Sequence, residues 1–180
     1  MSGLEFWTND RRFGLRLSKH QVWQILRMCV CANGTEVGGI LVGVYTSAHD
    51  CAIVKVVSGA PPDSQSGRAW FNRGVHGLQV WLDLQWYRRR HYYVGEWHFH
   101  PHGLPVPSQT DIRQMTSIAS SARYRCPEPV LLIIGGDPAA EWSVKAFVFP
   151  VGQDSAELIK CSDVTRSESD SNEEEKEQRL

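Results

Sequence analysis

The chain has 180 residues, a formal net charge of -1 and 42% hydrophobic residues. This length and apolar content fit one globular domain with a sizeable core. A charge so close to zero gives no electrostatic reason to expect a nucleic acid or a membrane as partner, and no apolar stretch has signal-peptide or transmembrane length. We therefore expect a soluble, cytoplasmic protein with neither kind of partner.

The cysteines are scattered along the chain and odd in number, which is not the pattern of a disulfide framework. Small apolar thiols of this kind are commonly buried. We therefore expect free, buried thiols at the five positions Cys29, Cys31, Cys51, Cys126 and Cys161.

The first third of the chain predicts an irregular arm, a helix and a hairpin. Residues 1–14 show no regular pattern and form the arm. Ser18 is a typical N-cap, and apolar residues recur behind it at helical spacing until an Asn-Gly pair ends the helix. Two apolar runs, 35–45 and 52–57, then predict a β-hairpin. Glycines are unusual inside a strand and indicate close approach of another backbone at Gly38, Gly39 and Gly43.

The middle of the chain changes from loop to helix to strand. Residues 59–67 are a loop by composition, and residues 69–72 predict a short strand. From residue 75 to about residue 90 the apolar residues return to helical spacing, and the basic triplet at 88–90 suits a helix C-terminus. Residues 92–99 then predict a strand.

The last third contains a helix, two strands and a tail. Three prolines and a glycine make residues 101–107 a loop, and Ser108 begins a helix that is broken at residues 126–129. An unbroken apolar run at 130–134 predicts a buried strand, and alternation at 142–149 predicts a further one.

After residue 160 the composition becomes acidic and rich in serine, with no aromatic residue. Such a segment cannot bury enough apolar surface to fold. We therefore expect one ordered domain over residues 1–160 and an acidic, disordered tail over residues 161–180.

Residues 95–111, GEWHFHPHGLPVPSQTD, carry a candidate metal site. His98 and His100 are one residue apart, so on a strand both imidazoles face the same side. Asp111 lies in the first turn of the helix that begins at Ser108, and it provides a carboxylate. Three protein ligands with a fourth position left open are the arrangement of a catalytic zinc ion.

Ser108 and Asp111 also have a simpler interpretation. A serine followed three residues later by an acid is the pattern of a capping box, in which each side chain bonds the other residue's backbone N–H. The two interpretations are compatible, because a cap that fixes the first helical turn also fixes the direction of the Asp111 side chain.

A zinc hydrolase needs a carboxylate to take a proton from water, and two glutamates are candidates. Glu96 lies two residues before His98 and shares its strand face, so spacing alone favours it. Glu36 lies far upstream, at the start of the glycine-rich run. The residues themselves leave this choice open.

Glu36 followed by VGGILVG, then HFHP, then seven positions to SQTD, resembles the signature of the JAMM (MPN+) metallopeptidases. That signature is a distant Glu followed by HxHx7SxxD, and every position is occupied here. The resemblance covers roughly residues 13–150. The stretches GAPPDSQSGRAWF and GEWHFHP are similar to the prokaryotic JAB branch, and most similar to the JAMM peptidases of antiphage CBASS operons.

The resemblance implies a role for each residue of the signature. His98, His100 and Asp111 bind zinc, Glu36 is the general base and acid, and Ser108 stabilises the oxyanion. Glu36 then replaces Glu96 as the preferred base. The implied fold is a JAMM/cytidine-deaminase-like α/β (α+β) domain, with a curved, mostly antiparallel sheet flanked by helices.

The implied function is that of a zinc-dependent isopeptidase or peptidase in antiphage defence. It hydrolyses the bond after the C-terminus of a ubiquitin-like modifier or of a conjugated CD-NTase, a cyclic-nucleotide synthase, so its partner is a protein substrate. Two alternatives stay open: a JAMM peptidase that processes a sulfur-carrier protein, and a non-catalytic MPN scaffold.

Overall fold

The computed structural model describes residues 3–161, which contain three helices and ten strands. In chain order these are β1 (Leu4–Trp7), β2 (Gly14–Leu17), α1 (Lys19–Cys31), β3 (Val37–Tyr45), β4 (Cys51–Val57), β5 (Gln65–Ser66), β6 (Phe71–Asn72), α2 (Leu78–Arg89), β7 (Tyr92–Pro101), α3 (Gln109–Ser120), β8 (Val130–Gly136), β9 (Trp142–Val148) and β10 (Ala156–Lys160).

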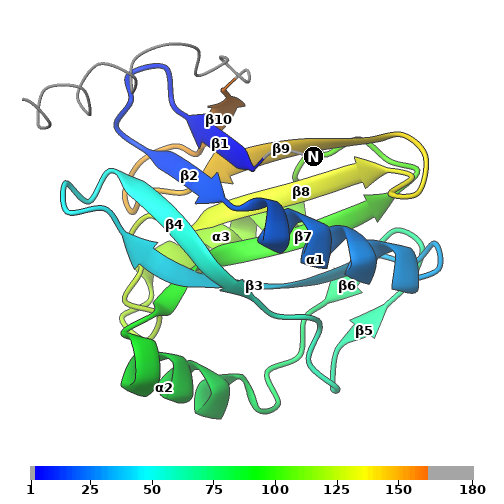
Figure 1. Ribbon diagram of the computed structural model, residues 1–180, viewed down its shortest axis with the longest axis horizontal. Helices are drawn as coiled ribbons and strands as arrows, with labels where there is room; N and C mark the ends of the chain where they lie inside the picture. The colour runs from blue at the N-terminus through cyan, green and yellow to red at the C-terminus, as the bar shows by residue number, and fades with distance from the viewer. Residues whose placement is uncertain (1–2, 162–180) are drawn as a thin grey trace, which may run out of the picture.

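Eight of the strands close into a barrel in the order β1-β10-β9-β8-β7-β3-β4-β2, and β5 and β6 form a separate two-stranded sheet. The pairs β2·β4 and β7·β8 are parallel, and the other neighbours are antiparallel. In Figure 1, α1 lies in front of the sheet and α3 behind it, while α2 stands apart below. The predicted α+β class, with a curved and mostly antiparallel sheet, is confirmed.

The predicted irregular arm over residues 1–14 is wrong, because most of it belongs to a hairpin. β1 pairs with β2 from Leu4↔Leu17 to Trp7↔Gly14, and a polar turn joins them. Both strands have only four residues, so alternation repeats too few times to be recognised in the sequence. The partner of β1 on its other side is β10, a five-residue strand that the sequence pattern also did not reveal.

The other predicted elements are present, most of them within a few residues of their expected ends, but the helix after Ser108 ends at Ser120, earlier than the predicted break at 126–129. The helix after Ser18 forms with a capping box between Ser18 and Gln21. The hairpin of β3 and β4, the strand β7, the helix after Ser108 and the strands β8 and β9 also form. The loop predicted at 59–67 contains the short strand β5 at its end.

Helix α2 forms where it was predicted, but none of its residues is fully buried. Leu78, Trp81 and Leu82 contact the core on one side, while Trp86 remains 49% exposed. A cavity of about 760 Å³ lies along the inner side of α2, bounded by residues such as Leu82, Trp86 and Tyr92. None of the three candidate metal ligands, His98, His100 and Asp111, lines this cavity.

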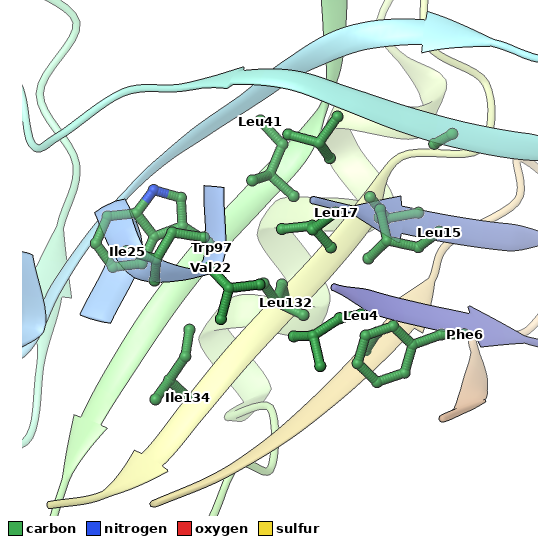
Figure 2. Packing of buried hydrophobic residues seen from close by; sticks show 14 of the residues in the cluster. Leu4, Phe6, Leu15, Leu17, Val22, Ile25, Leu41, Trp97, Leu132 and Ile134 are labelled. Atoms are coloured by element: carbon green, nitrogen blue, oxygen red, sulfur yellow. The ribbon is translucent and has the colours of Figure 1, made fainter. Parts of the chain in front are cut away.

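The core has two parts, one on each side of the strands β7 and β8. The first lies inside the barrel, where Trp97 and Leu132 pack with Val22 and Ile25 of α1 (Figure 2). The second lies under α3, where Met115 and Ile118 cover Ile40 and Ile133. Both faces of β7 are therefore covered, which agrees with its almost completely buried pattern.

The glycines of β3 sit where other backbones approach closely, as predicted. A Cβ on Gly38 would lie 2.5 Å from the carbonyl oxygen of Trp97 in β7. On Gly39 and Gly43 it would meet the carbonyl oxygens of Ser58 and Ile53 at even shorter distance. Neighbouring parts of the chain thus account for all three glycines.

The expectations drawn from composition have mixed outcomes. All five cysteines are free, but only Cys29, Cys51 and Cys126 are buried, while Cys31 is exposed. Among residues 3–161 no helix is long and apolar enough to span a membrane. The predicted acidic tail, apart from Cys161, lies outside the described residues, so the division at residue 160 stays a prediction.

Candidate metal centre

The two histidines of the HxH pair lie near the end of β7, between β3 and β8. His98 is buried and His100 is partly exposed, and their side chains point to the same side of the sheet together with Asp111 of α3. One ligand atom from each of the three residues lies within 4.8 Å of the other two. The structure therefore brings together the three metal ligands that the sequence predicted.

Asp111 takes part in the capping box and in this cluster at the same time. Its Oδ2 accepts a hydrogen bond of 2.7 Å from the Ser108 backbone N–H, and the Ser108 hydroxyl accepts one of 3.2 Å from the Asp111 backbone N–H. The other carboxylate oxygen, Oδ1, lies 2.9 Å from Nδ1 of His98. The cap therefore holds one oxygen and leaves the second for the cluster.

His100 is held by the loop that follows it. Its Nδ1 lies 3.2 Å from the carbonyl oxygen of Leu104, which leaves Nε2 available to bind a metal ion. The loop packs against β8, because a Cβ on Gly135 would lie 2.5 Å from the Gly103 carbonyl oxygen. His102 in the same loop is exposed and is not one of the three clustered residues.

The register between β3 and β7 determines where Glu36 lies. Val37 pairs with Phe99 and Gly38 with His98, so the register continued by one residue places Glu36 opposite His100. The Glu36 backbone N–H donates to the carbonyl of Gly67, which fixes the chain just before the strand. Glu36, which precedes His98 by more than sixty positions in the sequence, thus lies at the cluster of candidate metal ligands.

Glu96 occupies a very different place from Glu36. It shares the strand face of the histidines, as spacing predicted, but it is completely buried. Its Oε1 forms a 2.8 Å ion pair with Arg73, a side chain that is itself only 7% exposed. A buried carboxylate that is already paired with a guanidinium is poorly suited to exchange protons with water. The geometry therefore favours Glu36 as the base.

The charges of the cluster shift one another's pKa. Burial opposes the charged form of His98, but the carboxylates of Asp111 and Glu96 outweigh it and raise the pKa of the imidazole to about 9. Burial likewise opposes the charged form of Asp111, but its bond to His98 lowers the pKa to about 2. Burial raises the pKa of Glu36, an effect that His100 and His98 partly offset.

These pKa shifts have a simple chemical meaning. Without a metal, His98 and Asp111 behave as an ion pair across a short distance. A proton between His98 Nδ1 and Asp111 Oδ1 then occupies the position that a metal cation would take. A set of donor atoms that binds one positive charge in this way is also suited to bind a metal cation.

The donor set fits a metal ion. Zinc bonds of about 2.0–2.2 Å in a tetrahedral site place ligand atoms roughly 3.3 Å apart. The 2.9 Å between His98 Nδ1 and Asp111 Oδ1 is close to that separation. Two imidazoles and one carboxylate leave a fourth position for water or substrate, as catalytic sites require.

Two groups of residues around the site were not predicted from the sequence. Phe71 of β6 packs edge-on against the His98 ring, with ring centroids 5.7 Å apart. Arg73 and Gln114 both bind Glu96, through contacts of 2.8 and 3.0 Å. Gln114 lies one turn after Asp111 on α3, so helical spacing offered a signal for it. Phe71 ends the stretch GAPPDSQSGRAWF that carries the resemblance, but neither Phe71 nor Arg73 was predicted at the site, because β6 is too short to carry a periodic pattern.

Residues 18–147 match the family of prokaryotic homologs of the JAB domain. A CD-NTase/cGAS isopeptidase of Enterobacter hormaechei is 46% identical over 147 residues, which covers 82% of this chain and 81% of that protein. A probable metalloprotease of Sinorhizobium fredii, y4qB, is 29% identical over 122 residues, with 63% and 70% covered.

The fold has a counterpart among solved structures. The solution structure of a Desulfitobacterium hafniense protein aligns with a TM-score of 0.58 at 23% identity, and covers 79% of this chain and 87% of that one. The predicted resemblance and the expected enzyme class, a JAMM-type peptidase, are confirmed by the family and the relatives. The chain belongs to the prokaryotic JAB family.

Proposed function

We propose that this protein is a zinc-dependent isopeptidase of antiphage defence, which releases a CD-NTase from the protein to which its C-terminus is conjugated. The proposal is supported mainly by the β3–β7 register, in which the position before Val37, that of Glu36, falls opposite His100 and near the candidate ligands His98 and Asp111. The choice of substrate is supported by the 46% identity to a relative named as a CD-NTase/cGAS isopeptidase.

Zinc is the metal that this ligand set suits best. Nitrogen ligands from His98 and His100 with one oxygen from Asp111 form a three-ligand site of the catalytic type. When bound, zinc supplies Lewis acidity, which makes water more acidic and polarises the scissile carbonyl.

Glu36 transfers the proton in this mechanism. Its carboxylate is partly buried beside two imidazoles and has a raised pKa, with burial as the main cause. A carboxylate with a raised pKa is a stronger base than an exposed one. Glu36 accepts a proton from the attacking water and returns it to the leaving amine, which in an isopeptide is the ε-amine of a lysine.

Ser108 stabilises the oxyanion that forms when water attacks. Its side-chain oxygen accepts the Asp111 N–H as a helix cap, so the hydroxyl hydrogen is available to donate. A fixed donor beside a developing negative charge lowers the barrier of acyl transfer. The residue that caps α3 thus also contributes to the reaction.

The same chemistry can cleave an ordinary peptide bond. A sulfur-carrier-processing peptidase is therefore the alternative within the same enzyme class, and a linear fusion substrate distinguishes it from an isopeptidase. A non-catalytic scaffold is excluded if the protein binds zinc and turns over substrate. The cytoplasmic location stays a prediction.

Replacing His100 with alanine should abolish binding of one equivalent of zinc. At a zinc concentration 100 times its Kd, wild-type protein should gain about 2.7 kcal/mol of stability from the bound ion. Thermal unfolding with and without zinc measures this gain as a shift in Tm. His102→Ala is the matched control two residues away, and it should keep the full shift. A full shift in His100→Ala would contradict the ligand assignment.

Glu36→Gln should keep its zinc and lose about 10²–10⁴-fold in kcat, because the amide cannot accept a proton. The assay follows release of a CD-NTase from a lysine-linked conjugate, with and without a chelator. Glu141→Gln, at an exposed position, is the control that should behave as wild type. Undiminished turnover by zinc-loaded Glu36→Gln would refute the base assignment, and preference for a linear sulfur-carrier fusion would favour the alternative substrate.

Ser108→Gly separates the cap from the catalytic role. Glycine is a tolerable N-cap, so we expect a loss of only about a few tenths of a kcal/mol in the free energy of unfolding. The missing hydroxyl should still lower kcat by about 10²–10³-fold. Urea unfolding and steady-state kinetics on the same sample give both values. A variant that keeps its kcat would limit Ser108 to capping.

A further inference from the structure

Glu96 is a buried carboxylate beside the metal cluster that the proposed reaction does not use. It is completely buried, yet both of its oxygens are bonded. Oε1 accepts hydrogen bonds from Arg73 Nη2 at 2.8 Å and from the Tyr93 hydroxyl at 3.4 Å. Oε2 accepts one from Gln114 Nε2 at 3.0 Å. An ionised carboxylate is costly to bury, so three donors on separate elements indicate a specific role.

A local irregularity in β7 makes this network possible. The register between β3 and β7 shifts so that Gly95 pairs with Leu41 and Tyr93 with Val42, which leaves Val94 as an extra residue. Such a bulge changes which side chains share a face. Tyr93 and Glu96 thereby point to the same side although they are three residues apart, and the hydroxyl reaches the carboxylate.

The His98 ring lies between Asp111 and Glu96. Its Nδ1 faces Asp111 Oδ1 at 2.9 Å, and its Nε2 lies 3.6 Å from Glu96 Oε2. Nε2 is buried and has no hydrogen-bond partner within normal distance. A histidine that gives one nitrogen to a metal carries its proton on the other nitrogen and needs an acceptor there. Glu96 Oε2 is the carboxylate oxygen placed to accept it.

We propose that Glu96 is the positioning residue of His98: its Oε2 accepts a hydrogen bond from Nε2–H and keeps Nδ1 directed at the metal. This inference rests on the metal site proposed above and deepens it. His100 is held in a different way. The Leu104 carbonyl accepts a hydrogen bond from its Nδ1–H, so Nε2 is the nitrogen that binds the metal. The two histidines thus bind the metal through different nitrogens.

Arg73 connects this positioning to the segment before α2. Its guanidinium joins Glu96 to the carbonyl of Gly74 through a 3.1 Å hydrogen bond. Two residues earlier, Phe71 packs against the other side of the site, on the edge of the His98 ring. The segment around β6 therefore restrains His98 twice, through a charge and through an aromatic contact.

The test measures zinc affinity rather than turnover. In Glu96→Gln the amide nitrogen faces the donors of Gln114 and His98, so we expect the Kd for zinc to rise about 10–100-fold, the usual effect of losing such a partner. Competition with a coloured chelator gives the Kd. The absorption bands of bound Co²⁺, which respond to ligand geometry, should change as well. Glu128→Gln, at a partly buried glutamate outside the cluster, is the matched control and should keep the wild-type Kd.

A second variant removes the effect of an unpaired Arg73. Glu96→Met combined with Arg73→Met removes the acceptor and leaves no buried charge without a partner, and it should still bind zinc about 10–100-fold more weakly than wild type. A wild-type Kd and Co²⁺ spectrum in the double variant would overturn the inference, and that variant decides alone if Glu96→Gln does not fold. Failure of the wild-type protein to bind zinc would instead refute the proposed function.

Discussion

Backbone hydrogen bonding between β3 and β7 sets the positions of Glu36, His98 and His100 relative to one another. It pairs Val37 with Phe99, so that Glu36 lies opposite His100. The same pairing requires glycine at position 38, because a side chain there would clash with the backbone of Trp97 and the ring of His98. A shift of one residue would turn the histidines to the other face of the sheet. The close contact of these strands is therefore a condition for the chemistry.

Two carboxylates at the site, those of Asp111 and Glu96, are each compensated by a neighbouring positively charged group. Asp111 divides its two oxygens between the helix cap and His98. Glu96, one layer deeper, is neutralised by Arg73 and held by α3 through Gln114. Each carboxylate thus has a fixed direction before any metal arrives, which lowers the cost of ordering the ligands on binding. Among the carboxylates of Glu36, Glu96 and Asp111, only that of Glu36 has no hydrogen-bonded cation, and that suits a residue that must exchange protons.

Much of the fold and part of the site could be predicted from the sequence. The HxH strand and the capped helix were predictable because periodicity and capping act between neighbouring residues. The strands β1, β2 and β10 were not, since four or five residues carry too little alternation. Spacing alone selected Glu96 as the base, and only the family resemblance selected Glu36, because strand register is a property of the whole sheet. Arg73 was missed because its partner Glu96 lies 23 residues away, beyond helix α2.

A structure of the zinc-loaded protein, with the metal located by its anomalous scattering, tests this account most directly. We predict one ion bound by Nδ1 of His98, Nε2 of His100 and Oδ1 of Asp111. We also predict that the Glu36 carboxylate lies at hydrogen-bonding distance from the open coordination position, without direct contact to the metal. An ion bound by Glu96 or His102, or a Glu36 side chain turned away from the site, would contradict it.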